Sequence, residues 1–247
     1  TAAWAVFENL GVKFPPLTST RVVTPQTHRW PNFLKGDNLL NIANQIAVIA
    51  IIAIGMTMVI ISAGIDLSVG SLIALSAVVA TLLIREGAGA EQASSSAMFL
   101  CSLAGILLSS AVGCFSGVMV TAFGIPAFIV TLGMMLVASG LAYIFAKGQS
   151  IYQIPDAFIW LGRGADLGLP NAVLLMIVLY ALAHILMTRM TLGRYIYAVG
   201  GNPEAARLSG VPIRAVLIFV YTVSGALAGL GGIVMASQLK SADANYG

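Results

Sequence analysis

The sequence predicts an all-α protein, a polytopic membrane helix bundle with short broken helices. Of its 247 residues, 59% are hydrophobic and only 9% are charged, whereas soluble proteins carry about 25% charged residues. The apolar residues gather in long runs without acidic or basic side chains, and about 20 such residues in a helix cross the hydrocarbon core of a bilayer. Because water offers no place for so much apolar surface, the chain is expected to be an integral membrane protein.

Six apolar runs predict six membrane crossings. They lie within residues 38–65, 72–84, 97–123, 127–146, 167–188 and 215–239. Residues 1–40 instead mix prolines with charges, which is typical of an irregular extramembrane segment. We therefore expect an extramembrane N-terminal segment at 1–40 and a transmembrane domain at 41–247. The last run is followed by neither a helix cap nor a stop signal, so we expect the chain to be truncated at both ends.

The loop between the last two runs, residues 189–214, predicts the orientation of the bundle. It contains four arginines and one acidic residue, Glu204. An excess of arginine in a short loop marks the cytoplasmic side of a membrane. Counting crossings from this loop places the turn at 124–126 on the same side. The connections at 85–96 and 147–168 then lie on the opposite side.

The same loop contains the signals of a short helix that does not cross the membrane. Asn202 can cap its start, Pro203 suits its first turn, and Glu204 lies where the helix dipole favours an anion. Gly210 can stop this helix, and Pro212 prevents its resumption. About two helical turns are therefore expected outside the membrane. Such a helix either joins two spans or docks a cytoplasmic partner.

Asp66 marks a break between the first two spans. It is the only charged residue between Asp37 and Arg85, and a carboxylate in mid-membrane costs about 2.5–3.5 kcal/mol on insertion scales. We expect Gly64 to end the first helix and Asp66 to cap the second by accepting an N–H bond from Ser68 or Val69. The break is either a tight turn at the membrane surface or a conformationally active break beside the solute path. In the second case Gly64, Asp66, Ser68, Gly70 and Ser71 belong to that path.

Polar and small residues elsewhere predict helix packing. Asn41, Asn44 and Gln45 share one helix face at spacings of three and four, where amides either bind neighbouring helices or face the solute. A ridge of small residues recurs at every fourth position of the third span: Gly105, Ser109, Gly113 and Gly117. Such a ridge lets another helix approach closely.

Several function classes lack support in the sequence. No basic stripe suggests nucleic-acid binding. Cys101 and Cys114 would lie about 20 Å apart on one helix, too far for a disulfide. His28 and His184 stand alone, so no metal site is expected. No nucleophile–base pair indicates an enzyme.

Three motifs together resemble a known family. They are Gly55-Met56-Thr57-Met58-Val59-Ile60 leading to Gly64-Ile65-Asp66-Leu67-Ser68-Val69-Gly70-Ser71, then Phe128-Ile129-Val130-Thr131-Leu132-Gly133, then Leu192-Gly193-Arg194-Tyr195-Ile196-Tyr197-Ala198-Val199-Gly200-Gly201-Asn202 leading to Glu204-Ala205-Ala206-Arg207-Leu208-Ser209-Gly210. In this order they resemble the permease subunits of bacterial ABC importers for simple sugars, above all the ribose, xylose and galactose permeases. The resemblance extends from about residue 31 to residue 247.

The resemblance implies the partners and the mechanism. Two permease subunits, as a homodimer, would enclose the path of the sugar across the bacterial cytoplasmic (inner) membrane. Two cytoplasmic ABC ATPase subunits would grip the extramembrane helix, which makes it a cytoplasmic coupling helix. A periplasmic or lipid-anchored sugar-binding protein would deliver the substrate. This chain itself would bind no cofactor, since it lacks a Walker A pattern and ATP would be bound by the partner subunit.

The resemblance also assigns candidate residues. The ATPase-coupling residues would be Gly201, Asn202, Pro203, Glu204, Ala205, Ala206, Arg207, Leu208, Ser209 and Gly210. Phe128 and Thr131 would join Asn41, Asn44, Gln45 and the residues of the break along the translocation path.

Two alternative functions remain. A branched-chain amino-acid ABC permease belongs to the same superfamily, although the Gly64–Ser71 string favours the sugar branch. An ion-coupled secondary transporter would need an ionisable residue near the membrane midplane, and Asp66 is the only candidate. A position of Asp66 near the cytoplasmic surface would weaken that second alternative.

Overall fold

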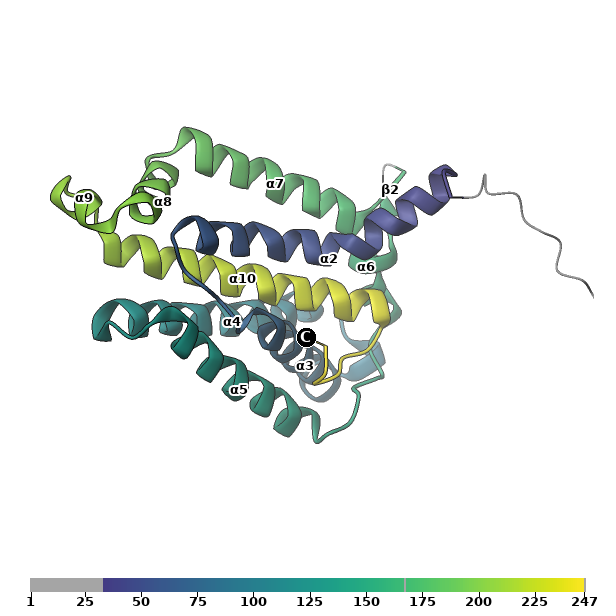
Figure 1. Ribbon diagram of the computed structural model, residues 1–247. Coiled ribbons are helices and arrows are strands. Elements are labelled where there is room, and N and C mark those ends of the chain that lie inside the picture. The colour runs from purple at the N-terminus through teal and green to yellow at the C-terminus, as the bar shows by residue number, and fades with distance from the viewer. Residues whose placement is uncertain (1–32, 167, 247) are drawn as a thin grey trace, which may run out of the picture. The chain divides into compact units, whose positions relative to one another are not determined.

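The computed structural model describes residues 33–166 and 168–246 (Figure 1). The chain divides into two units, residues 1–38 and 39–247. In the described part of the first unit, the Asn38 side-chain amide donates to the Phe33 carbonyl at 2.9 Å. Residues 1–32 of the extramembrane segment predicted at 1–40 lie outside the described residues.

Within residues 33–166 and 168–246, six long helices confirm the six predicted spans, because each is long and apolar enough to cross a membrane. They are α2 (Gly36–Ile61), α3 (Val69–Gly87), α4 (Ser95–Phe123), α5 (Ala127–Ala146), α7 (Asn171–Arg189) and α10 (Ile213–Leu239). The first of them begins before residue 41, the start that we predicted for the transmembrane domain. It also ends at Ile61, four residues earlier than the apolar run 38–65 suggests.

Short elements join the spans. They are η3 (Ala90–Gln92), η4 (Asp156–Ile159), α6 (Trp160–Arg163), the antiparallel pair β1 (Ala165–Asp166) and β2 (Leu169–Pro170), α8 (Thr191–Gly201) and α9 (Pro203–Leu208). The sequence predicted α9 but not α8 or α6.

Helix α10 is the central helix of the second unit, and glycine allows its close approach to α4 (Figure 1). A methyl group at Gly113 would lie 2.2 Å from the Tyr221 carbonyl oxygen, and one at Gly117 would lie 2.8 Å from Ile218 Cα. A methyl group at Gly225 of α10 would likewise lie 2.4 Å from the Ser109 carbonyl oxygen of α4. The predicted small-residue ridge therefore packs against α10, and its first member, Gly105, packs against α3.

The glycine contacts also show which connections share an end of the bundle. Gly117 of α4 lies against Ile218 near the start of α10, and Gly200 of α8 lies against Ile61 at the end of α2. The α4–α5 turn, the end of α2 and the loop containing α8 and α9 therefore share one end. At the other end, Gly162 of α6 lies against Gln238 of α10. This agrees with the order of crossings counted from the sequence, while the cytoplasmic assignment still depends on the arginines.

Candidate functional site

The break after α2 begins with a residue that the sequence did not predict in that role. Ala63 adopts the left-handed conformation, with φ of 60°. The Ala63 N–H donates to the Ile60 carbonyl at 3.0 Å, and the Gly64 N–H donates to the Val59 carbonyl at 2.9 Å. This pair of bonds is a Schellman motif, which usually places glycine where Ala63 stands. We expected Gly64 to end the first helix, but Ala63 provides the left-handed residue at that end.

Gly64 is needed for space instead. A methyl group there would lie 2.5 Å from the Tyr221 hydroxyl of α10 and 3.1 Å from a Val59 methyl group. Left-handed backbone costs a non-glycine residue about 1–2 kcal/mol. The glycine thus stands where the Tyr221 side chain of α10 packs against the break, and the alanine has the left-handed backbone.

Asp66 lies at the centre of a buried hydrogen-bond network, with 3% of its surface exposed. One of its carboxylate oxygens accepts from the Ser68 N–H at 3.0 Å and from the Ser68 hydroxyl at 2.6 Å. The other accepts from the Ser224 hydroxyl of α10 at 2.9 Å. The expected bond from Ser68 to Asp66 is confirmed. Asp66 nevertheless lies two residues before Ser68, which is the cap residue of α3.

Neighbouring helices also hold the residue before Asp66. The Ile65 carbonyl accepts from the Tyr221 hydroxyl of α10 and from the Thr131 hydroxyl of α5, each at 3.4 Å. The Thr131 hydroxyl shares its proton with the Ala127 carbonyl of its own helix at 2.9 Å. The break is therefore attached to α5 through one hydroxyl and to α10 through two. Among the residues of the break that the sequence singled out, Ser71 is buried and donates to the Ser68 carbonyl at 2.8 Å. Gly70 lies beside it in the first turn of α3.

The depth of Asp66 separates the two interpretations of the break. Its partner Ser224 lies 11 residues after Ile213, the first residue of α10, which is about 16 Å along a helix. The remaining 15 residues to Leu239 span about 22 Å. Asp66 thus lies beside the middle of a membrane-spanning helix and inside the protein, where a broken helix is tolerated. This placement favours the buried break over the surface turn.

The short helix α9 matches its prediction closely. The Asn202 side-chain oxygen accepts from the Ala205 N–H at 3.0 Å, and Pro203 occupies the first helical turn. Gly210 is left-handed, with φ of 82°, and the following Val211 N–H donates to the Ala206 carbonyl at 3.0 Å. Local sequence therefore determines both ends of the helix.

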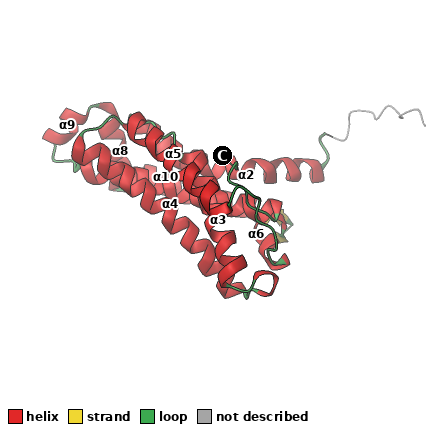
Figure 2. Ribbon diagram, turned by 90° about the horizontal axis from the view of Figure 1, so that it is seen from below, coloured by secondary structure: helices red, strands yellow, loops and turns green. Residues whose placement is uncertain are grey.

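The surface of α9 is almost entirely exposed. The resemblance assigns the ten residues Gly201–Gly210 to coupling, and of these only Ala206 is buried. Glu204 and Arg207 form an ion pair at 2.8 Å with side chains 72% and 68% exposed. Leu208 is 85% exposed, the highest value among the large apolar residues that the structure describes. Figure 1 shows α9 beyond the N-terminal end of α10, and Figure 2 shows it again at that end of the bundle.

Helix α8 connects α9 to the end of α2. A methyl group at Gly200 would lie 1.7 Å from the Ile61 carbonyl oxygen. At the start of α8, a methyl group at Gly193 would lie 2.5 Å from the carbonyl oxygens of Leu186 and Met187 in α7. Both glycines belong to the motif that carries the resemblance, but neither the helix nor its contacts were predicted.

The amide cluster of α2 lies far from the break. Asn44 precedes the end of α2 by 17 residues, which is about 26 Å. The Asn44 side-chain nitrogen donates to the Gly162 carbonyl at 3.0 Å, and the Asn44 backbone carbonyl accepts from the Gln238 side-chain amide at 2.8 Å. Asn41 and Gln45 are exposed. Asn44 therefore joins α2 to α6 and α10, as expected of a packing amide, and the structure does not bring these amides together with Asp66.

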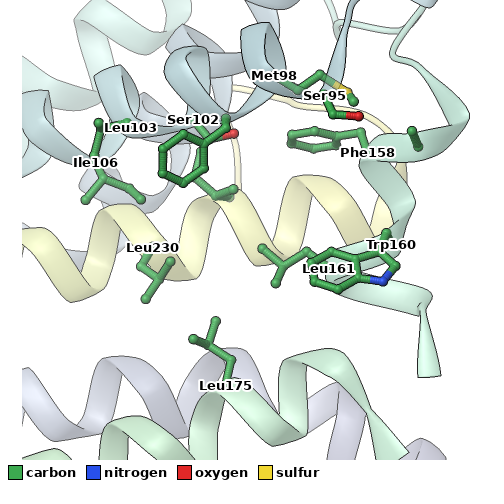
Figure 3. Close-up of a pocket in the computed structure, with 13 residues that line it drawn as sticks. Ser95, Met98, Ser102, Leu103, Ile106, Phe158, Trp160, Leu161, Leu175 and Leu230 are labelled. Carbon is green, nitrogen blue, oxygen red and sulfur yellow. The ribbon is translucent and has the colours of Figure 1, made fainter. Parts of the chain in front are cut away.

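Two further features lie apart from the break. Phe128 of α5 is 49% exposed, although Thr131, one turn later, reaches the break. A pocket of about 700 Å³ lies between α4, α6, α7 and α10, where Figure 3 shows Phe158, Leu161, Leu175 and Leu230 around it. Its lining is mostly apolar, which suits hydrocarbon better than the hydroxyl groups of a sugar.

The described residues thus define a class, a multi-pass helical membrane protein with an exposed extramembrane helix. Comparison with known proteins identifies the family. The model of the family described as "Branched-chain amino acid transport system / permease component" matches residues 38–247, and the chain belongs to this family of permeases. It is accordingly a multi-pass protein of the cytoplasmic membrane and a transport component.

Named relatives carry the comparison further. The chain is 40% identical to the ribose import permease protein of Escherichia coli (strain K12) over 221 residues, which are 88% of this chain and 66% of that protein. It is 33% identical to the ribose import permease protein of Bacillus subtilis (strain 168), with 88% and 66% covered. It is 33% identical to the D-allose transport system permease protein of Escherichia coli (strain K12), with 85% and 63% covered. No solved structure gave a significant match.

Proposed function

We propose that this chain is the transmembrane permease subunit of an ABC importer that moves a monosaccharide across the cytoplasmic membrane. Relatives named as ribose and D-allose permeases support this proposal, although the chain spans only 66% of the length of the first of them. The observation that carries the proposal is α9, a helix capped at both ends of which only Ala206 is buried. A loop that merely joins α7 and α10 does not need such a helix.

The proposed partners follow from this role. A separate ABC ATPase binds α9 and hydrolyses ATP, a second permease subunit completes the path, and a periplasmic or lipid-anchored binding protein delivers the sugar. The surface of α9 suits a protein partner, because an exposed leucine lies beside an ion pair of opposite charges. An apolar centre with a polar rim is typical of protein–protein interfaces.

Substitutions on α9 test the attachment of the ATPase. Glu204→Lys and Leu208→Asp, made in the full chain, are each expected to reduce co-purification of the ATPase and sugar uptake by about tenfold. The Glu204–Arg207 pair is exposed and contributes little to folding, so membrane insertion and expression should be unchanged. Glu86→Lys is the matched control, since Glu86 forms an exposed pair with Arg85 at the end of α3. Wild-type ATPase recruitment and uptake in both α9 variants would exclude α9 as the docking helix.

Uptake assays distinguish the substrate classes. We expect vesicles that contain the assembled importer to accumulate ribose or another monosaccharide when ATP is present on the side of the ATPase. We expect them not to accumulate leucine. Accumulation of leucine instead would support the branched-chain amino-acid alternative. Accumulation driven by an ion gradient without ATP would support the secondary transporter.

A further inference from the structure

The break between α2 and α3 links two regions of the protein. One is α9, where the ATPase is proposed to bind, and the other is the set of helices around the middle of the bundle. This inference rests on the proposed function. Three sets of contacts connect α9 to Asp66 without a gap.

The first set makes α8 a rigid connection between α9 and α2. Asn202 caps α9 with its side chain, while its own N–H donates to the Ala198 carbonyl of α8 at 3.1 Å. One residue thus ends one helix and starts the next. At Gly200 the backbone of α8 touches the backbone of α2 so closely that a methyl group would lie 1.7 Å from an oxygen. A displacement of α8 toward α2 must therefore move the end of α2, because neither backbone can yield as a side chain does.

The second set begins at that contact. The Gly200 contact includes both Ile61, the last residue of α2, and Ser62, the first residue after it. Residues 62–68 then run to α3 without regular helix. A segment of this kind can absorb a change in backbone angles that a continuous helix cannot. The end of α2 is thus the point at which motion of α8 enters the break.

The third set transmits that motion to other helices. Ile65 is bound by hydroxyls of α5 and α10, and Asp66 is bound by Ser224 of α10. A carboxylate inside a membrane protein is costly to leave without hydrogen bonds. Asp66 therefore keeps its hydrogen bond with Ser224 when the segment shifts, and α10 moves with the segment.

We propose that Gly200 and Asp66 are positioning residues of the transport cycle. Gly200 passes displacement of α9 to the segment 62–68, and the Asp66–Ser224 hydrogen bond passes it on to α10. Asp66 acts here as a hydrogen-bond acceptor.

Ser224→Ala is the decisive variant. It removes the bond to α10 and leaves both bonds from Ser68 to Asp66. Loss of one such bond is expected to reduce the sugar imported per ATP hydrolysed by about fivefold, with ATPase recruitment and ATP hydrolysis unchanged. Thr222→Ala is the matched control, because the Thr222 hydroxyl on the same helix donates only to the Ile218 carbonyl. Asp66→Asn, whose amide can accept from Ser68 and donate to Ser224, should keep the wild-type ratio.

Hydrogen exchange measures whether the nucleotide state reaches residues 62–68, which a purely structural role of Gly200 would not affect. In the assembled wild-type importer, a non-hydrolysable ATP analogue should change the exchange rate of residues 62–68. Gly200→Ala should weaken that response, whereas Gly140→Ala should not, since a methyl group at Gly140 meets nothing within 4 Å. If Gly200→Ala fails to fold, Ser224→Ala still decides the question.

The outcomes separate this inference from the proposed function. Coupling in Ser224→Ala equal to that in Thr222→Ala, or exchange at 62–68 that ignores the nucleotide analogue, would overturn the inference and leave the permease assignment intact. Loss of uptake in Asp66→Asn would overturn it in favour of ion coupling through the charge. A wild-type chain that recruits no ATPase would overturn both.

Discussion

Gly113 offers the sharpest test of the packing at the centre of the bundle. It lies where α4 crosses α10, and a methyl group there would meet the Tyr221 carbonyl oxygen at 2.2 Å, the Tyr221 carbonyl carbon at 3.1 Å and Gly225 Cα at 3.2 Å. All three are backbone atoms. Relief by rotation of a side chain is therefore excluded, and Gly113→Ala must push the two helices apart by about 1 Å to reach ordinary contact distance.

Two effects of opposite sign decide the magnitude. Alanine stabilises a helix interior by about 1 kcal/mol relative to glycine. Overpacking of a tight interior costs about 1–3 kcal/mol, and the upper part of that range applies where backbone meets backbone. We therefore expect Gly113→Ala to reduce the free energy of unfolding by about 1–2 kcal/mol. For a chain of this size, that corresponds to a Tm lower by about 2–8 °C.

Thermal unfolding of the detergent-solubilised protein measures this effect. Gly140→Ala in α5 is the control, because the added methyl group meets nothing within 4 Å and only the gain in helix propensity remains. It should leave the Tm unchanged or raise it slightly. A Tm of Gly113→Ala equal to that of Gly140→Ala would refute the close approach of α4 and α10.

Two further predictions concern the opposite end of the bundle. Asn44→Ala removes the donor to the Gly162 carbonyl and should cost about 1–3 kcal/mol of stability, whereas Asn41→Ala, at an exposed position, should leave the Tm unchanged; equal Tm values would show that Asn44 does not join α2 to α6. The hydrogen bond from the Ser150 hydroxyl, followed by that from the Asn245 N–H, lowers the pKa of Asp243 from its ordinary value of 3.8. A lowered folded-state pKa means that this contribution to stability is present above pH 3.8 and is lost as the pH falls through the lower value. The protection of residues 241–246 from hydrogen exchange, relative to the unfolded chain at the same pH, should therefore fall below pH 3.8, and Ser150→Ala should lower it already at neutral pH; protection in Ser150→Ala equal to that of the wild type would contradict this.

The parts of the fold that were predictable are those governed by local sequence. The spans follow from uninterrupted apolar runs, and the ends of α9 follow from Asn202, Pro203 and Gly210, whose preferences act within a few residues. Helix α8 was not predictable in this way. Gly193 and Gly200 weaken its helix propensity, and the reason for each glycine is a backbone contact with another helix.

The break shows most clearly why sequence reasoning reached its limit. Local preference favours Gly64 as the left-handed residue, yet in the structure Ala63 is left-handed, and Tyr221 fills the space where a side chain at position 64 would lie. Asp66 was recognised as exceptional from its charge, but its partner Ser224 lies 158 residues further along the chain. Nothing in the run 215–239 distinguishes Ser224 from a packing serine. Contacts between distant residues thus determined both the geometry of the break and the partner of its carboxylate.

The two ends of α2 differ in a way that bears on how the bundle can move. In the first half of α2, Asn44 forms hydrogen bonds with Gly162 and Gln238. A side chain at Gly162 would be excluded, because its methyl group would lie 2.4 Å from the α10 backbone. The Ser237 hydroxyl adds a bond from the Gly162 N–H at 2.7 Å. At its other end, α2 passes into residues 62–68, which are attached to α5 through one side-chain hydroxyl and to α10 through two. A force applied at α9 therefore meets backbone contact at Gly200, then a non-helical segment bound to α10 by the Asp66–Ser224 hydrogen bond, and finally a fixed joint at the far end of α2. This order places the least costly rearrangement in the backbone angles of residues 62–68, since a non-helical segment can change them while its buried carboxylate keeps its hydrogen bond, whereas backbones in contact cannot interpenetrate.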